Sequence, residues 1–247
     1  MSIVPVWTLI LGAAVFFYVV LDGFDLGIGM LYNFAGNRGD RQSMMNSIAP
    51  VWDGNETWLV LGGLGLLAAF PVAFAIILPA VYFPILVMLL ALVFRGVAFE
   101  FQFRDAEHRH FWDHAFGIGS AVATFAQGIV LGAFIQGFDV QGRHFAGGSF
   151  DCFTPFSLFT GLALMCGYSL LGACWLILKT EGALAERARR WARAAFLGTL
   201  AAVGVVSLWT PFIDPDIARR WFSWPNILFL SPVPLATAVT GFLWWRA

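Results

Sequence analysis

Two pairs of acidic residues in this sequence have the spacing and surroundings that reversible proton binding requires. Asp22 and Asp25 lie three positions apart near the end of the first apolar segment, and Asp53 and Glu56 repeat this spacing near the start of the second. Residues three apart share one face of a helix. Two carboxylates close together in a low-dielectric medium do not both ionise easily, so such a pair can take up and release a proton.

Each pair also has an ordinary structural interpretation that the sequence leaves open. Asp22 and Asp25 could be solvated acids at a membrane interface. Asp53 follows Pro50 by three residues and could complement the exposed N–H groups in the first turn of a helix. Because Asp at the centre of a membrane helix costs about 2.5–3.5 kcal/mol on insertion scales, two acids within one turn favour a functional role.

The third apolar segment adds charged residues to this group. Arg95 and Glu100 lie near its end, in the stretch 94–101. A buried guanidinium needs an acidic partner, and the candidates are Asp53, Glu56 and Glu100. We therefore predict that three helices bring a charge-compensated network to one depth of the bilayer.

The composition indicates the elements that position these residues. Of 247 residues, 60% are hydrophobic and only 12% are charged, with a mean hydropathy of +0.78. This is typical of a multi-pass membrane protein, and since only helices satisfy the backbone of such segments in hydrocarbon, we predict an all-α bundle. The net charge of −1 and the scattered arginines exclude nucleic-acid binding. Seven apolar segments are near the ~20 residues needed to cross a membrane: 4–34, 47–70, 71–94, 113–136, 156–178, 194–212 and 226–245.

Basic residues predict the orientation of these segments, because Lys and Arg concentrate on the cytoplasmic side. When successive connections are assigned to alternate sides of the membrane, most Lys and Arg residues fall on one side. This places the amino terminus outside and both acidic pairs toward the cytoplasm. The opening segment has no basic region before it, so we expect no cleavable signal.

Other residue types favour packing over chemistry. The four histidines, at 108, 110, 114 and 144, form no pair in opposed spans, so we expect this chain to bind neither haem nor metal. Gly23 and Gly27 form a small-xxx-small pair that lets a second helix approach closely. Trp58 lies deeper than the interfacial tryptophans, although a deep Trp is more often a packing residue.

Four motifs in order resemble subunit II of the cytochrome bd-type quinol oxidases. They are DGFDLG at 22–27, NSIAPVWDGNETW at 46–58, FRGVAFEF at 94–101 and GYSLLGACWLILKTEG at 167–182. The last of them is similar to the shorter, cyanide-insensitive branch of that family. The resemblance covers essentially the whole chain.

The resemblance implies a bacterial inner-membrane complex. In that family a partner, subunit I, carries haem b558, haem b595 and haem d, oxidises quinol and reduces dioxygen to water, while subunit II carries no haem. Membrane lipids and a small accessory transmembrane subunit are further expected partners. The family has eight spans in two four-helix halves, so we expect a first bundle at 1–136, an outside loop at 137–155 and a second bundle at 156–247 that lacks the last span.

The resemblance also assigns roles to matching residues. Asp53 matches the acid proposed to bring cytoplasmic protons across the subunit interface toward the oxygen-reducing haem, with Asp22 and Asp25 beside its entrance. Arg95 and Glu100 match the third motif. Trp58 matches a tryptophan associated with an oxygen passage.

The resulting hypothesis is a haem-free subunit that supports subunit I and supplies part of the proton route. A proton-coupled secondary transporter is the main alternative, since buried acids in opposed helices are equally expected there. A purely structural, lipid-facing scaffold is a third.

Overall fold

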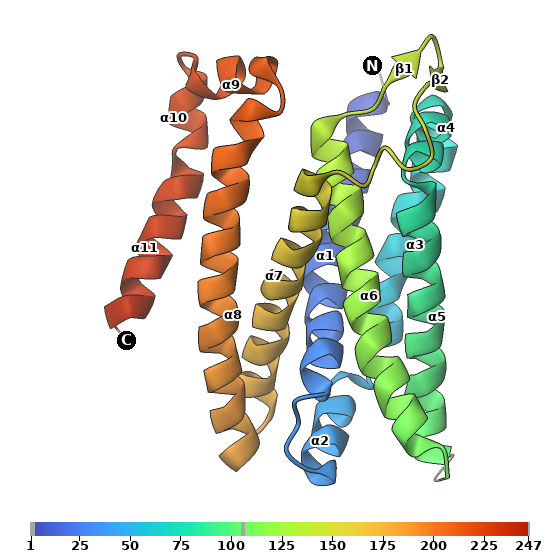
Figure 1. Ribbon diagram of the computed structural model, residues 1–247, viewed down its shortest axis with the longest axis vertical. Helices are drawn as coiled ribbons and strands as arrows, with labels where there is room; N and C mark the ends of the chain where they lie inside the picture. Colours follow the sequence, from blue (N-terminus) through green and yellow to red (C-terminus); the bar gives the residue numbers. More distant parts are fainter. Residues whose placement is uncertain (1–2, 105–106, 247) are drawn as a thin grey trace.

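The computed structural model describes residues 3–104 and 107–246, and within these ranges the chain is almost entirely helical (Figure 1). The predicted all-α fold is confirmed. In chain order the helices are α1 Val4–Tyr32, α2 Arg38–Ile48, α3 Trp52–Ala69, α4 Pro71–Ala80, α5 Tyr82–Arg104, α6 Arg109–Gln136, α7 Pro155–Lys179, α8 Gly182–Trp209, the 3-10 turn Thr210–Phe212, α9 Pro215–Phe222, α10 Asn226–Leu230 and α11 Pro232–Arg246. Two short antiparallel strands, β1 Val140–Gln141 and β2 His144–Phe145, lie between α6 and α7.

The described helices provide fewer candidate spans than the seven predicted segments. Five are long and apolar enough to cross a membrane, namely α1, α5, α6, α7 and α8. A sixth span is possible if α9 and the segment Asn226–Phe242, which meet at an angle of 91°, are counted as one broken span. The predicted segment 71–94 is divided at Val81 into α4 and α5. The segment 47–70 contains α3, whose first turns carry Asp53, Asn55 and Glu56, so its apolar part is short.

A helix break before Pro71 separates α3 from α4. The residue before a proline is pushed out of the α region, and Phe70 has φ −134° and ψ 60°. Figure 1 shows α4 near β2, while α5 runs back along the bundle beside α6. The break therefore lets α3 and α5 both contribute side chains to the bundle interior.

The centre of the bundle is α1, which packs against α3, α6 and α7. In turn α5 packs on α6 and α8 on α7, while α10 and α11 stand beside α8 at one edge (Figure 1). The contact of α11 with α8 includes the stacked rings of Phe196 and Trp244, whose centroids are 4.9 Å apart. The half of α1 that carries Asp22 and Asp25 is thus the buried half, covered by α3, α6 and α7.

Glycines bring α1 and α7 into backbone contact. A Cβ on Gly172 would lie 2.5 Å from the carbonyl carbon of Gly27, and a Cβ on Gly27 would overlap the carbonyl oxygen of Tyr168. A Cβ on Gly23 would lie 2.9 Å from the Tyr168 ring. The predicted packing role of Gly23 and Gly27 is confirmed.

Candidate functional site

Asp22 and Asp25 lie in the interior of the bundle, where each is 0% exposed. The alternative that they are solvated acids is therefore wrong for this structure. The Asn55 side chain, from α3, donates from Nδ2 to Asp25 Oδ2 at 2.7 Å and to the carbonyl oxygen of Leu21 at 3.3 Å. A neutral amide thus stabilises one of the two buried carboxyl groups.

Arg95, from α5, links the carboxyl groups of α1 and α3. Its side chain is 1% exposed, and Nη1 lies 3.7 Å from Asp22 Oδ1 and donates to Glu56 Oε1. The predicted compensation of Arg95 by Glu56 is confirmed, and Asp22 is a second partner. Since the Glu56 side chain is 25% exposed, the group extends from the protein surface to the interior.

Aromatic rings and unpaired polar atoms surround this guanidinium. The Arg95 Cζ atom lies 5.8 Å from the Trp52 ring centroid and 6.0 Å from that of Phe116. Both Asp22 carboxylate oxygens, Asp25 Oδ1, and Arg95 Nε and Nη2 are buried without a hydrogen-bond partner. Buried polar groups are normally satisfied, so these atoms mark a place where hydrogen bonds can be exchanged. That capacity is what a proton relay requires.

Two of the predicted members lie outside this cluster. Asp53 is exposed in the first turn of α3, which agrees with the helix-start interpretation of that residue. Glu100 is 61% exposed and pairs with Arg104 at 3.6 Å. Glu100 follows Arg95 by five residues on α5, a rotation of about 140° around the helix axis, so the two side chains point in different directions. Of the three candidate partners of Arg95, Glu56 forms the ion pair, and the candidates Asp53 and Glu100 do not.

Trp58, on α3, packs against an aromatic ring of α1. Its ring is half-buried and lies 4.9 Å from that of Phe17 on α1, with the two planes tilted by 37°. This geometry agrees with a packing role.

A further polar chain, which the sequence reasoning missed, begins one turn before Asp22. The Gln127 side chain donates from Nε2 to the Tyr18 hydroxyl at 2.6 Å, and the Tyr168 hydroxyl donates to Gln127 Oε1 at 3.1 Å. Tyr18 and Tyr168 are buried, and these residues belong to α1, α6 and α7. In the sequence, the features that could have indicated this chain are Gln127, an amide within an apolar segment, and Tyr18, four residues before Asp22.

A second network, also unpredicted, lies where α1 ends. The Tyr32 hydroxyl donates to Asp113 Oδ1 at 2.6 Å and lies 3.0 Å from Gln102 Oε1, and Arg41 Nη1 donates to Asp113 Oδ2 at 2.8 Å. These contacts join α1, α2, α5 and α6.

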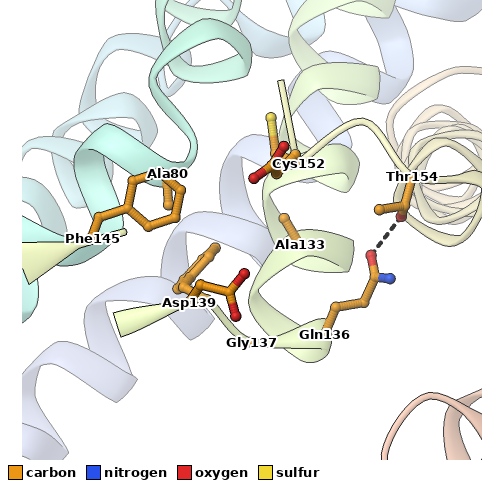
Figure 2. Close-up of a pocket in the computed structure, with 10 residues that line it drawn as sticks. Ala80, Ala133, Gln136, Gly137, Asp139, Phe145, Cys152 and Thr154 are labelled. Carbon is orange, nitrogen blue, oxygen red and sulfur yellow. Dashed lines mark hydrogen bonds between the residues drawn. The ribbon is translucent and has the colours of Figure 1, made fainter. Parts of the chain in front are cut away.

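At the opposite end of the bundle, the 137–155 connection covers a pocket of about 370 Å³ (Figure 2). Gln136 Oε1 accepts from Thr154 Oγ1 at 2.5 Å, and Asp151 Oδ2 accepts from the Gly148 amide at 2.6 Å. Burial raises the pKa of the Cys152 thiol, which favours its neutral form. In the described part of the chain, no group of three or more His, Cys, Asp and Glu side chains is arranged to hold a metal ion.

Comparison with known proteins identifies the family. The family profile described as cytochrome bd terminal oxidase subunit II matches residues 3–247. The chain belongs to this family. As a bd oxidase subunit II, it is similar to the cytochrome bd-I ubiquinol oxidase subunit 2 of Escherichia coli, with 34% identity over 223 residues that cover 87% of this chain and 59% of the relative.

Other bd oxidase relatives show the same partial coverage. A probable cytochrome oxidase subunit 2 of Haemophilus influenzae is 30% identical over 98% of this chain and 65% of its own length, and the cytochrome bd ubiquinol oxidase subunit 2 of Bacillus subtilis is 32% identical over 78% and 58%. The chain therefore spans about three fifths of the length of these relatives. A bd oxidase structure from Geobacillus thermodenitrificans shares the fold, with a TM-score of 0.77 and 20% identity over 100% of this chain and 77% of that one.

Proposed function

We propose that this chain is the haem-free subunit II of a bd-type quinol:oxygen oxidoreductase in the bacterial inner membrane. It would support a subunit I that carries haem b558, haem b595 and haem d, and it would supply part of the cytoplasmic proton route for reduction of dioxygen to water. Family membership supports the assembly, and three similar proteins are named as oxidase subunits. The observation that carries the proton role is the buried group of Asp22, Asp25 and Glu56 around Arg95.

The proposed route begins at the surface and moves inward by exchange of hydrogen bonds. Asp53 is exposed and stands three residues before Glu56, which is itself a quarter exposed and bonded to Arg95. Asp22 lies on the other side of the guanidinium. Arg95 stabilises whichever carboxylate is ionised, so a proton can move between Glu56 and Asp22 without leaving an uncompensated buried charge.

The proposed arrangement in the membrane places the amino terminus outside and these carboxyl groups toward the cytoplasm. It also divides the chain into a first bundle at 1–136, an outside loop at 137–155 and a second bundle at 156–247, after the eight-span pattern of two four-helix halves. The uneven distribution of Lys and Arg supports this orientation.

The test is quinol-dependent oxygen consumption by the complex purified from its native membrane. Asp53→Asn, Asp22→Asn and Glu56→Gln should each lower turnover by about tenfold or more while the haem spectra stay intact. Asp216→Asn, which removes an exposed carboxylate on α9, is the control and should leave turnover unchanged. Full turnover with Asp53→Asn would remove that residue from the route.

The same preparation separates the alternatives. A haem-containing partner with a reduced-minus-oxidised spectrum supports the oxidase subunit, whereas a haem-free chain that moves a solute supports a proton-coupled transporter. If the acid substitutions reduce stability and leave turnover per assembled complex unchanged, the chain acts as a scaffold.

A further inference from the structure

A pocket of about 600 Å³ lies between the end of α1 and the starts of α2 and α6. We call it the basic pocket, because its lining includes Arg38, Arg41, Arg109 and His110. We propose that the basic pocket binds the phosphate group of an anionic ligand. Its volume is within the range of roughly 300–1,000 Å³ that is usual for small-molecule sites.

The charges in the lining favour an anion. Three guanidinium groups face one carboxylate, that of Asp113, which is paired with Arg41 at 2.8 Å. Two guanidinium groups of the lining, those of Arg38 and Arg109, therefore have no carboxylate among the lining residues to compensate them. Near a membrane surface such groups attract anionic phosphates strongly.

One acid beside the pocket is already paired. Asp40 lies on α2, and Arg187 of α8 pairs with it at 2.6 Å. In Arg41, Nη1 is bound to Asp113. The guanidinium groups of Arg38 and Arg109 therefore carry the excess charge that an anion would compensate.

The backbone adds to the positive potential. α2 begins at Arg38 and α6 at Arg109, so the amino-terminal ends of two helices border the same pocket. The first turn of α6 contains no acidic residue. That of α2 contains Asp40, and the Asn37 side chain accepts a hydrogen bond from the Asp40 amide. Helix starts carry partial positive charge and outward N–H groups, which suit phosphate oxygens.

The pocket at the other end of the bundle provides a contrast within the same molecule. That pocket, in Figure 2, is lined by Asp139 and Asp151 and by no Lys or Arg. Of these two pockets, the basic pocket is therefore the one whose lining has an excess of positive charge. It lies at the end predicted to face the cytoplasm, where both anionic lipid head groups and soluble phosphates are present.

The experiment measures binding to the purified complex in detergent by native mass spectrometry and by titration. The probes are phosphatidylglycerol, phosphatidylcholine and inorganic phosphate. The variant Arg38→Gln/Arg109→Gln removes the two uncompensated charges and should weaken binding of the anionic probe about tenfold or more. Arg41 is kept, because its bond to Asp113 joins α2 to α6.

The controls separate lost binding from lost folding. Arg190→Gln removes an exposed charge from α8 outside the pocket and should bind as the unaltered protein does. Arg38→Lys/Arg109→Lys keeps the charge and should retain most of the binding.

Each outcome decides the proposal. Selective retention of phosphatidylglycerol over phosphatidylcholine, lost in the glutamine variant, supports the site with a lipid as its ligand. Saturable binding of inorganic phosphate without lipid retention, lost in the same variant, supports it with a soluble ligand. Binding of neither probe, or equal binding by the glutamine variant and Arg190→Gln, overturns it. None of these outcomes depends on the oxygen-reducing activity.

Discussion

Replacing Arg95 by leucine should cost about 3–5 kcal/mol of stability, because it leaves buried carboxyl groups without their positive partner. The attraction between Arg95 Nη1 and Asp22 Oδ1 at 3.7 Å is about 4.5 kcal/mol at an effective dielectric constant of ~20. Glu56 contributes less, since its side chain is 25% exposed and water screens it. Arg95→Lys keeps the charge but loses the planar fork, and should cost about 1–2 kcal/mol.

The assay is unfolding of the purified protein in mixed detergent micelles as the mole fraction of dodecyl sulfate is raised, followed by far-ultraviolet circular dichroism. Arg104→Leu is the control, because Arg104 is 79% exposed and its pair with Glu100 should contribute almost nothing. Adding Asp22→Asn to Arg95→Leu should restore part of the lost stability, since the uncompensated carboxylate is then absent. Equal midpoints for Arg95→Leu and Arg95→Lys, or no recovery with Asp22→Asn, would refute this reasoning.

Two other substitutions can be followed in the same assay. Gly27→Ala should destabilise the protein by about 1–3 kcal/mol, because the new Cβ overlaps the carbonyl oxygen of Tyr168, whereas Gly63→Ala on α3 meets nothing within 4 Å and should be neutral or stabilising. Equal midpoints for these two variants would count against the backbone contact of α1 with α7. Asn55→Ala should cost about 1–3 kcal/mol by leaving Asp25 Oδ2 without its donor, and an unchanged midpoint would show that this bond contributes nothing.

The sequence was sufficient to predict the features that depend on local pattern. Composition and the length of the apolar segments predicted the helical membrane fold. The small-residue spacing of Gly23 and Gly27 predicted close packing, now seen against α7. The need of a buried guanidinium for an acid predicted a partner for Arg95 among Asp53, Glu56 and Glu100, and Glu56 is that partner. These arguments rest on local spacing and on strong energetic penalties.

Features that depend on rotation about a helix axis or on distant pairing could not be predicted in this way. Glu100 lies about 7.5 Å farther along α5 than Arg95 and faces another direction. Asp53 lies at an exposed helix start. The bond between Tyr18 and Gln127 joins residues 109 positions apart, and neither residue has a local pattern that names the other.

The order in which the buried partners are synthesised has a consequence for biogenesis. Asn55 follows Asp25 by 30 residues, and Arg95 follows Glu56 by 39. At ~5–20 residues per second, α1 is exposed to the insertion machinery for several seconds before its neutralising guanidinium is made. During that interval α1 carries two acids without a positive partner, and only the neutral Asn55 amide is available to Asp25, so we infer that α1 stays near the interface and settles only when α5 arrives. The first helix of the chain then reaches its final place only after α5 has been made.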